Sequence, residues 1–184
     1  MSEIEVGPPY ELGPMPNDRL METVDQRLVR APLRAIFELA RDVEQWPDHL
    51  AHYRWVFFHE STADGGGIVE MAAWRPFGIF GIRAWWMSEM QVDDARPAIR
   101  FRHIGGVTRG MDVEWSFTPA DGGTLVRIVH VWDGPRWPLI GGFAATRVIG
   151  PVFVHGIASR TLAGLAAAAE RDSNATLRGN ESNE

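Results

Sequence analysis

An apolar stripe near the end of the chain is the strongest pattern in the sequence. From Pro151 to about Arg171 no further proline occurs, and good helix formers such as Ala and Leu dominate. Gly150 and Pro151 suit the start of a helix, because proline needs no backbone partner in the first turn. Such a helix is about 30 Å long and needs an apolar surface of similar length to cover it. The stripe consists of Val154, Ile157, Ala158, Thr161, Leu165 and Ala168.

Stretches that alternate apolar and polar residues predict an antiparallel sheet before this helix. Glycine-containing turns at Ala63–Gly67 and Asp121–Gly123 separate them, and Pro76–Gly81 is expected to interrupt the pattern. Two short helices, starting near Pro32 and Asp42, are expected between the first and second strands. The expected strands are 20–30, 53–60, 68–74, 82–92, 98–104, 110–119 and 124–132. Tight turns leave no room for crossover helices, so the fold class is α+β.

One domain, residues 20–171, is expected between two irregular ends. Residues 1–19 contain four prolines and are expected to form an irregular arm. Residues 172–184 are polar and are expected to be a disordered tail.

The composition restricts the kinds of partner. Eight Trp and nine Phe against two Tyr indicate a large core or the lining of an apolar cavity. A net charge of −6 without a basic cluster makes nucleic acid an unexpected partner. The absence of Cys rules out disulfides and thiolate chemistry and fits the cytoplasm. Neither a signal peptide nor a membrane span is expected, since no apolar stretch approaches about 20 residues.

Several of these features together resemble a known superfamily. Ala31-Pro32, the tract Ala40–Asp48, the strands and the closing helix resemble START-like (SRPBCC) proteins over about residues 20–170. The similarity is greatest to the polyketide cyclase/dehydrase (aromatase/cyclase) branch, with ubiquinone-binding START-like proteins as near relatives. The resemblance implies a helix-grip fold, in which a curved antiparallel sheet of about seven strands wraps the long C-terminal helix around a deep apolar cavity.

The tract Trp46–Tyr53 resembles that of bacterial aromatase/cyclases, which implies that its Trp and Tyr lie at the cavity. The same resemblance implies cavity positions for four later residues, Trp86, Ser88, Arg102 and Trp115. The Arg that those cyclases carry two positions after the Ser is replaced here by Met90. This departure favours a carrier over an enzyme.

Strand alternation supports cavity residues independently of the resemblance. In residues 124–132 one face carries Val126, Ile128, His130 and Trp132, and in residues 110–117 one face carries Met111, Val113, Trp115 and Phe117. If these faces look at the helix, His130 lies in an apolar cavity. Burial would disfavour its charged form there, and it could shuttle a proton near neutral pH. A structural histidine with one hydrogen-bond partner is the alternative.

The candidate catalytic residues are His130, Arg102 and Tyr53. The candidate ligand-binding residues are Trp46, Leu50, Trp86, Ser88, Met90, Met111, Val113, Trp115, Ile128, Trp132, Phe153 and His155. An inward Arg102 would polarise a carbonyl, whereas an outward one would face water. His49 and His52 have a spacing found in zinc sites, but no third ligand converges on them, so neither a metal nor a cofactor is expected.

The expected function is binding of an apolar ligand by a cyclase/dehydrase-type enzyme. It would hold a poly-β-ketone chain, polarise a carbonyl with Arg102 or Tyr53 and move protons with His130 or water. The alternative is a non-catalytic carrier for a quinone, lipid or isoprenoid, and a third option is a subunit of a larger complex. The expected partners are the small molecule and, for the enzyme, an acyl carrier protein or partner biosynthetic enzyme, with the chain as monomer or homodimer.

Overall fold

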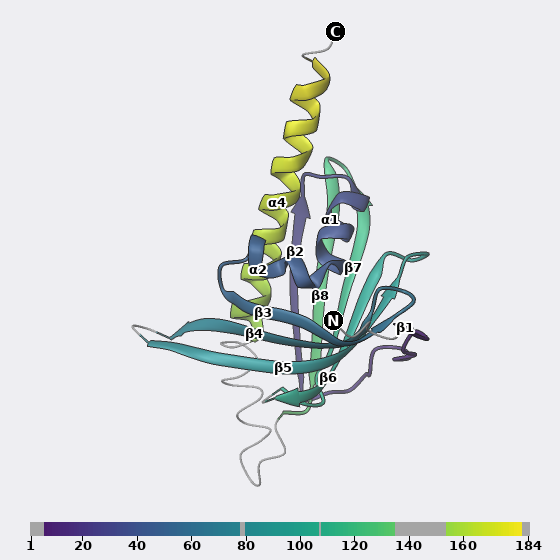
Figure 1. Ribbon diagram of the computed structural model, residues 1–184, viewed down its shortest axis with the longest axis vertical. Coiled ribbons are helices and arrows are strands. Elements are labelled where there is room, and N and C mark those ends of the chain that lie inside the picture. The colour runs from purple at the N-terminus through teal and green to yellow at the C-terminus, as the bar shows by residue number, and fades with distance from the viewer. Residues whose placement is uncertain (1–5, 78–79, 107, 135–153, 182–184) are drawn as a thin grey trace.

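A computed structural model describes residues 6–77, 80–106, 108–134 and 154–181. The described part contains an eight-stranded sheet in the order β1-β3-β4-β5-β6-β7-β8-β2 (Figure 1). Every neighbouring pair is antiparallel except β1 and β3, which are parallel. The strands are β1 Val6–Gly7, β2 Met21–Val29, β3 Tyr53–Thr62, β4 Gly67–Phe77, β5 Phe80–Asp93, β6 Ala98–Gly106, β7 Asp112–Ala120 and β8 Gly123–Trp132. The helices are α1 Leu33–Arg41, the 3-10 helix η1 Val43–Gln45, α2 Trp46–His49 and α4 His155–Glu181.

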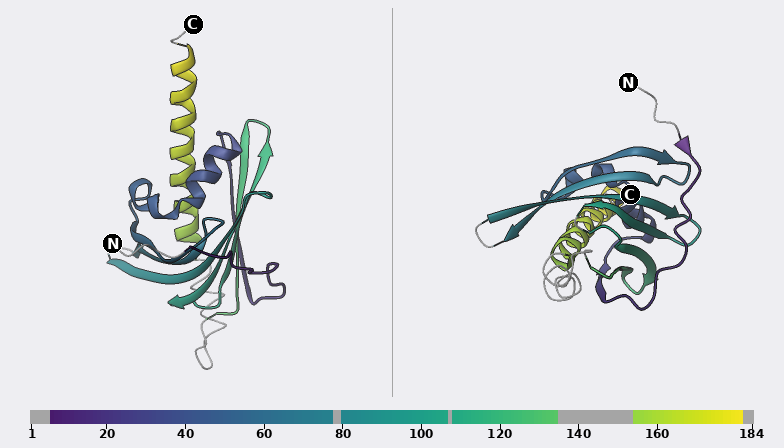
Figure 2. Two further views of the ribbon diagram at one scale, coloured as in Figure 1. Left: turned by 45° about the vertical axis from the view of Figure 1, so that its right-hand side comes forward. Right: turned by 90° about the horizontal axis from the view of Figure 1, so that it is seen from below.

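The sheet curves around the first half of α4, and the second half of the helix extends beyond it (Figure 2). Five of the six predicted stripe residues are buried, and Ile157 is half-buried. Helix α1 closes the other end of the core, where Phe37 meets Phe117 edge to face at a ring distance of 5.3 Å. The α+β class and the helix-grip architecture predicted from the sequence are therefore confirmed.

The hairpin between β4 and β5 corrects one expectation. Pro76–Gly81 was expected to interrupt the strands, yet Pro76 pairs with Gly81 and Phe77 with Phe80. The last residue pair between β3 and β4 is Tyr53 with Ala73. Among the described residues, β4 therefore has no strand on its other side at Pro76, where the missing N–H of proline interrupts no ladder.

The C-terminal tail is a second correction. Helix α4 continues to Glu181, although residues 172–184 were expected to be disordered. Asp172 to Asn174 are polar, but no proline follows them, and adding residues to an existing helix avoids the cost of a new nucleus. The predicted start of this helix at Pro151 lies outside the described residues.

From Val6 onward the N-terminal arm is held against the outer face of the sheet. Val6 and Gly7 pair with Ser61 and Thr62 of β3. Leu12 is buried, and its N–H donates to the side chain of Gln91 on β5 at 3.2 Å. The arm therefore covers part of β5 and β6 on the side away from α4.

Candidate functional site

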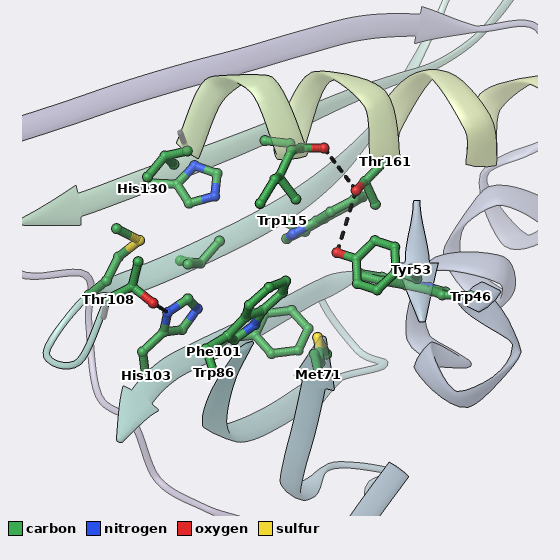
Figure 3. A pocket seen from close by; sticks show the side chains of 15 residues that line it. Trp46, Tyr53, Met71, Trp86, Phe101, His103, Thr108, Trp115, His130 and Thr161 are labelled. Atoms are coloured by element: carbon green, nitrogen blue, oxygen red, sulfur yellow. Dashed lines mark hydrogen bonds between the residues drawn. The ribbon is translucent and has the colours of Figure 1, made fainter. Parts of the chain in front are cut away.

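A cavity lies between the inner face of the sheet and the first turns of α4 (Figure 3). The volume of the cavity is about 80 Å³. This is below the roughly 300–1,000 Å³ of typical ligand pockets, but it exceeds the roughly 10–15 Å³ that one water needs. The fifteen lining residues are Trp46, Tyr53, Met71, Trp86, Phe101, His103, Thr108, Met111, Val113, Trp115, His130, Val154, Ile157, Ala158 and Thr161.

Aromatic rings form much of the cavity wall. Trp46 packs edge-on against Tyr53 at 5.2 Å and lies 5.7 Å from Trp115, and Tyr53 lies 6.1 Å from Trp86. The indole N–H of Trp46 donates to the carbonyl of Leu39 at 3.1 Å, so its polar atom is satisfied outside the cavity. The rings thus present flat apolar surface to a ligand.

His103 on β6 stands at one end of the cavity in a fixed orientation. Its Nδ1 lies 2.7 Å from the hydroxyl of Thr108, and its ring stacks on Trp86 at 6.1 Å and 17°. A register shift between Met87 and Ser88 marks a bulge next to this stack. Burial lowers the pKa of His103 to about 3. The ring is therefore neutral at neutral pH, with one nitrogen donating and the other accepting.

His130 on β8 lies at the same end of the cavity (Figure 3). Strand alternation predicted this inward position. Its Nδ1 has a long contact, 3.4 Å, with the hydroxyl of Thr23 on β2. Burial lowers the pKa of His130 to about 3, and the nearby His103 and His155 contribute to the same shift. This low pKa disfavours the proton shuttle near neutral pH that the sequence suggested, because the ring then stays neutral at the operating pH.

Tyr53 and Thr161 form the polar group at the opposite end (Figure 3). Their hydroxyls share a hydrogen bond of 3.4 Å, and the hydroxyl of Thr161 donates to the carbonyl of Ile157 at 2.9 Å. The Thr161 oxygen also lies 3.1 Å from Nε2 of His52, whose pKa is lowered by burial and then by Arg160. Burial raises the pKa of Tyr53, so its hydroxyl keeps its proton and can donate it.

Seven of the residues proposed from the sequence line the cavity together: Trp46, Tyr53, Trp86, Met111, Val113, Trp115 and His130. Five others are buried in the core without lining it: Leu50, Ser88, Met90, Ile128 and Trp132. Trp132, for example, directs its indole N–H to the carbonyl of Arg109 at 3.0 Å. Phe153 lies outside the described residues.

Arg102 lies on the outer face of the sheet, which is the second of the two positions that the sequence allowed, and it does not line the cavity. Its Nε donates to Asp112 and its Nη2 to the carbonyl of Leu12, both at 3.0 Å. Since side chains alternate along a strand, Phe101 and His103 occupy the inner face and Arg102 the outer one. The arm and the buried Asp112 supply the polar partners that make the outer position favourable.

His155 also lies outside the lining. Its exposed ring forms an ion pair of 2.6 Å with Asp25 on β2. Burial raises the pKa of Asp25, although His155 counteracts the shift. The pair links the start of α4 to β2, which is a structural role rather than the ligand-binding role expected from the sequence.

Eight lining residues were not among the candidate site residues. Four of them belong to the predicted helical stripe, namely Val154, Ile157, Ala158 and Thr161. The other four are Met71, Phe101, His103 and Thr108. Strand alternation in the sequence could have indicated Phe101 and His103. If the arginines of Arg100–His103 face outward, then Phe101 and His103 must face inward. Thr108 carried no signal, because it lies in a loop and reaches His103 only by the folding of that loop.

Metal ligands do not converge within the part of the chain that the structure describes. No three His, Asp or Glu side chains gather there in a way that could hold a metal ion. No helix within the described ranges is long and apolar enough to cross a membrane.

Three solved structures illustrate the fold that this chain shares with other proteins. The chain is similar to TTHA0849 from Thermus thermophilus, with 20% identity, a TM-score of 0.69, and coverage of 83% of this chain and 99% of that one. It is similar to the Zhui aromatase/cyclase from Streptomyces sp. R1128, with 20% identity, a TM-score of 0.65, and coverage of 82% and 94%. A START superfamily protein from Mycobacterium smegmatis shares 17% identity at a TM-score of 0.58, with coverage of 84% and 98%. No curated protein sequence matches the chain.

The family model for polyketide cyclase/dehydrase and lipid transport matches residues 29–149. That stretch runs from the end of β2 through α1, η1 and α2 and then from β3 to β8, so it includes most of the cavity lining. The chain therefore belongs to the polyketide cyclase/dehydrase and lipid-transport family.

Proposed function

We propose that the protein binds an apolar ligand in this cavity and promotes its cyclisation and dehydration. Family membership implies a hydrophobic ligand. The observation that supports catalysis is the pair of polar groups, His103 with His130 and Tyr53 with Thr161, inside an otherwise apolar lining. Hydrogen-bond donors in such a site act on developing charge far more strongly than they do in water. Delivery by an acyl carrier protein in the cytoplasm belongs to the same proposal.

The chemistry of an aldol closure fits these groups. A methylene between two carbonyls loses a proton to water, the resulting enolate carbon bonds a second carbonyl carbon, and the oxygen of that carbonyl takes up a proton. The Thr161 hydroxyl can donate either to the carbonyl of Ile157 or to the hydroxyl of Tyr53. When Tyr53 accepts this hydrogen bond, its own proton is free to be donated to that oxygen. A neutral imidazole N–H can stabilise the enolate oxygen at the other end. Loss of the new hydroxyl and a neighbouring proton as water then completes the reaction.

Substitution of the donors tests this proposal. Tyr53→Phe and His103→Leu are expected to lower turnover of a poly-β-ketone surrogate by about 10²-fold, the scale of one oxyanion donor. Thr124→Val, which removes a buried hydroxyl bonded to the carbonyl of Ala31, is the matched control. Product is followed by chromatography against the spontaneous rate. Wild-type turnover in the folded Tyr53→Phe/His103→Leu double variant would refute the catalytic role.

A non-catalytic carrier is the second candidate. The fifteen lining side chains are all uncharged at neutral pH, Arg102 lies on the outer face, and Met90 is in the core. A carrier needs shape and apolar area more than charge. If this candidate is right, the wild type does not exceed the spontaneous rate, while Trp86→Ala and Trp115→Ala release the ligand.

A further inference from the structure

We propose that His52 relays a proton from solvent to Tyr53 through the hydroxyl of Thr161. This inference rests on the proposed function, in which Tyr53 donates its proton to the oxygen left by the aldol closure, and it adds the residue that replaces this proton. His52 lies just before β3, and Thr161 lies on α4. Three observations support the relay: a continuous row of hydrogen-bond contacts, the burial of its members, and the cost of an ionised Tyr53.

The hydrogen-bond contacts between His52 and Tyr53 can all point toward the cavity. Nε2 of His52 lies 3.1 Å from the Thr161 hydroxyl, which lies 3.4 Å from the Tyr53 hydroxyl (Figure 3). Thr161 has a single proton, which it donates to the carbonyl of Ile157 or to Tyr53. Its oxygen is therefore the acceptor in the contact with His52, and Nε2 carries the hydrogen. Each member of the row can then donate to the next.

His52 is the member of this row that reaches solvent. Thr161 is 1% exposed and Tyr53 is 7% exposed, whereas His52 is half-buried. Burial, and then the nearby Arg160 on α4, lower the pKa of His52, so its ring is neutral at neutral pH. A neutral imidazole can take up a proton on one nitrogen while it gives one up from the other. His52 is therefore suited to passing protons rather than storing them.

The buried Tyr53 needs such a supply of protons. Burial raises the pKa of Tyr53, so the phenolate that remains after it gives up a proton is strongly disfavoured. The rings of Trp46 and Trp86, at 5.2 Å and 6.1 Å from the Tyr53 ring, offer this phenolate no ionic partner. Tyr53 must therefore regain a proton as it loses one, and Thr161 is the donor in contact with it.

The protons balance over one aldol closure. The substrate methylene gives one proton to water. Tyr53 gives one to the new alkoxide oxygen, Thr161 gives one to Tyr53, and Nε2 of His52 gives one to Thr161 while Nδ1 takes one from solvent. One proton thus leaves a carbon of the substrate and one arrives at its oxygen, and the three side chains end uncharged. His52 acts through Thr161 and Tyr53, so it is a positioning residue that does not touch the substrate.

Replacement of His52 by Gln tests the relay with the poly-β-ketone surrogate. The Gln side chain keeps an N–H donor, but it cannot take up a proton while it gives one up. The kcat is expected to fall about tenfold, less than the roughly 10²–10⁴-fold of a residue that meets the substrate, because water in the cavity replaces part of the supply. The KM is expected to stay within about twofold, since His52 does not line the cavity. His49→Gln, at an exposed histidine of α2, is the matched control and is expected to keep the wild-type kcat.

Imidazole added to the solution distinguishes a relay from a structural role. In His52→Ala it is expected to raise kcat about fivefold, because a free ring can enter the vacated space and pass protons to Thr161. In Thr161→Val the row is interrupted inside the protein, so kcat falls and imidazole has no effect. Thr161→Ser keeps the hydroxyl and is expected to retain most of the activity. Thermal unfolding shows whether each variant is folded.

The outcomes separate the relay from the proposed function. Wild-type kcat in folded His52→Gln, or a loss in His52→Ala that imidazole does not restore, would overturn the relay. The proposed function survives either result if Tyr53→Phe still lowers turnover. Product formation by the wild type at only the spontaneous rate would refute the proposed function, and the relay with it.

Discussion

The variant Arg102→Ala distinguishes a structural role of this residue from the catalytic role that the resemblance to aromatase/cyclases implied. Arg102 holds Asp112 and the carbonyl of Leu12, each at 3.0 Å, on the outer face of the sheet. In Arg102→Ala the buried Asp112 keeps only Arg100, at 3.8 Å. The variant is therefore expected to be less stable but fully active.

The size of the effect follows from the burial of the two partners. Breaking a buried ion pair destabilises a protein by about 3–5 kcal/mol. The Asp112 side chain is only 4% exposed, but that of Arg102 is 37% exposed, so solvent screens part of the interaction. About 2 kcal/mol is expected, which lowers Tm by roughly 4–8 °C in a domain of this size.

Thermal unfolding and ligand titration measure the two outcomes on the same preparation. The affinity for naphthalene, measured by quenching of tryptophan fluorescence, and product formation are expected to stay within about twofold of wild type in Arg102→Ala. The reason is that the Arg102 side chain does not line the cavity. Arg102→Lys serves as a control that keeps the charge but loses the forked geometry. Loss of turnover in Arg102→Ala with an unchanged Tm would refute the structural assignment.

Three further changes have defined outcomes. Trp115→Ala should destabilise the fold by about 3–5 kcal/mol and weaken naphthalene binding at least tenfold, as measured by urea unfolding and titration, because it opens the cavity wall. As the pH is lowered from 6.5 to about 3, the unfolded chain binds protons at His103 and His130, whereas the folded protein keeps both rings neutral. The free energy of unfolding should therefore decrease by roughly 1.4 kcal/mol per pH unit for each histidine. Urea midpoints at pH 7 and 5 should show this slope reduced in His103→Leu, and an unchanged slope would contradict the neutral buried state. Gly106→Ala should strongly lower the free energy of unfolding measured with urea. Gly106 has a φ of +83°, and an added Cβ would lie 2.3 Å from the carbonyl oxygen of Trp85. Wild-type stability of this variant would show that the backbone relaxes there.

Local patterns in the sequence determined much of this protein. Alternation along β7 and β8 placed Val113, Trp115 and His130 on the inner face, because side-chain direction in a strand depends only on parity. Helical spacing placed Val154, Ala158 and Thr161 on the buried side of α4 for the same kind of reason. The turn at Asp121–Gly123 followed from glycine, since Gly122 adopts a φ of +81°.

Contacts between distant parts of the chain decided the rest. The outward position of Arg102 depends on Asp112 and on the arm near Leu12, which is 90 residues away in sequence. The Thr161 hydroxyl meets Tyr53 across 108 residues, and Thr108 reaches His103 through a loop without a strand or helix pattern. The neutral state of His103 and His130 arises from burial, which is a property of the assembled core. Parity and helical spacing tell which side chains share a face, but only the packed fold decides which of them surround a cavity and how they are charged there.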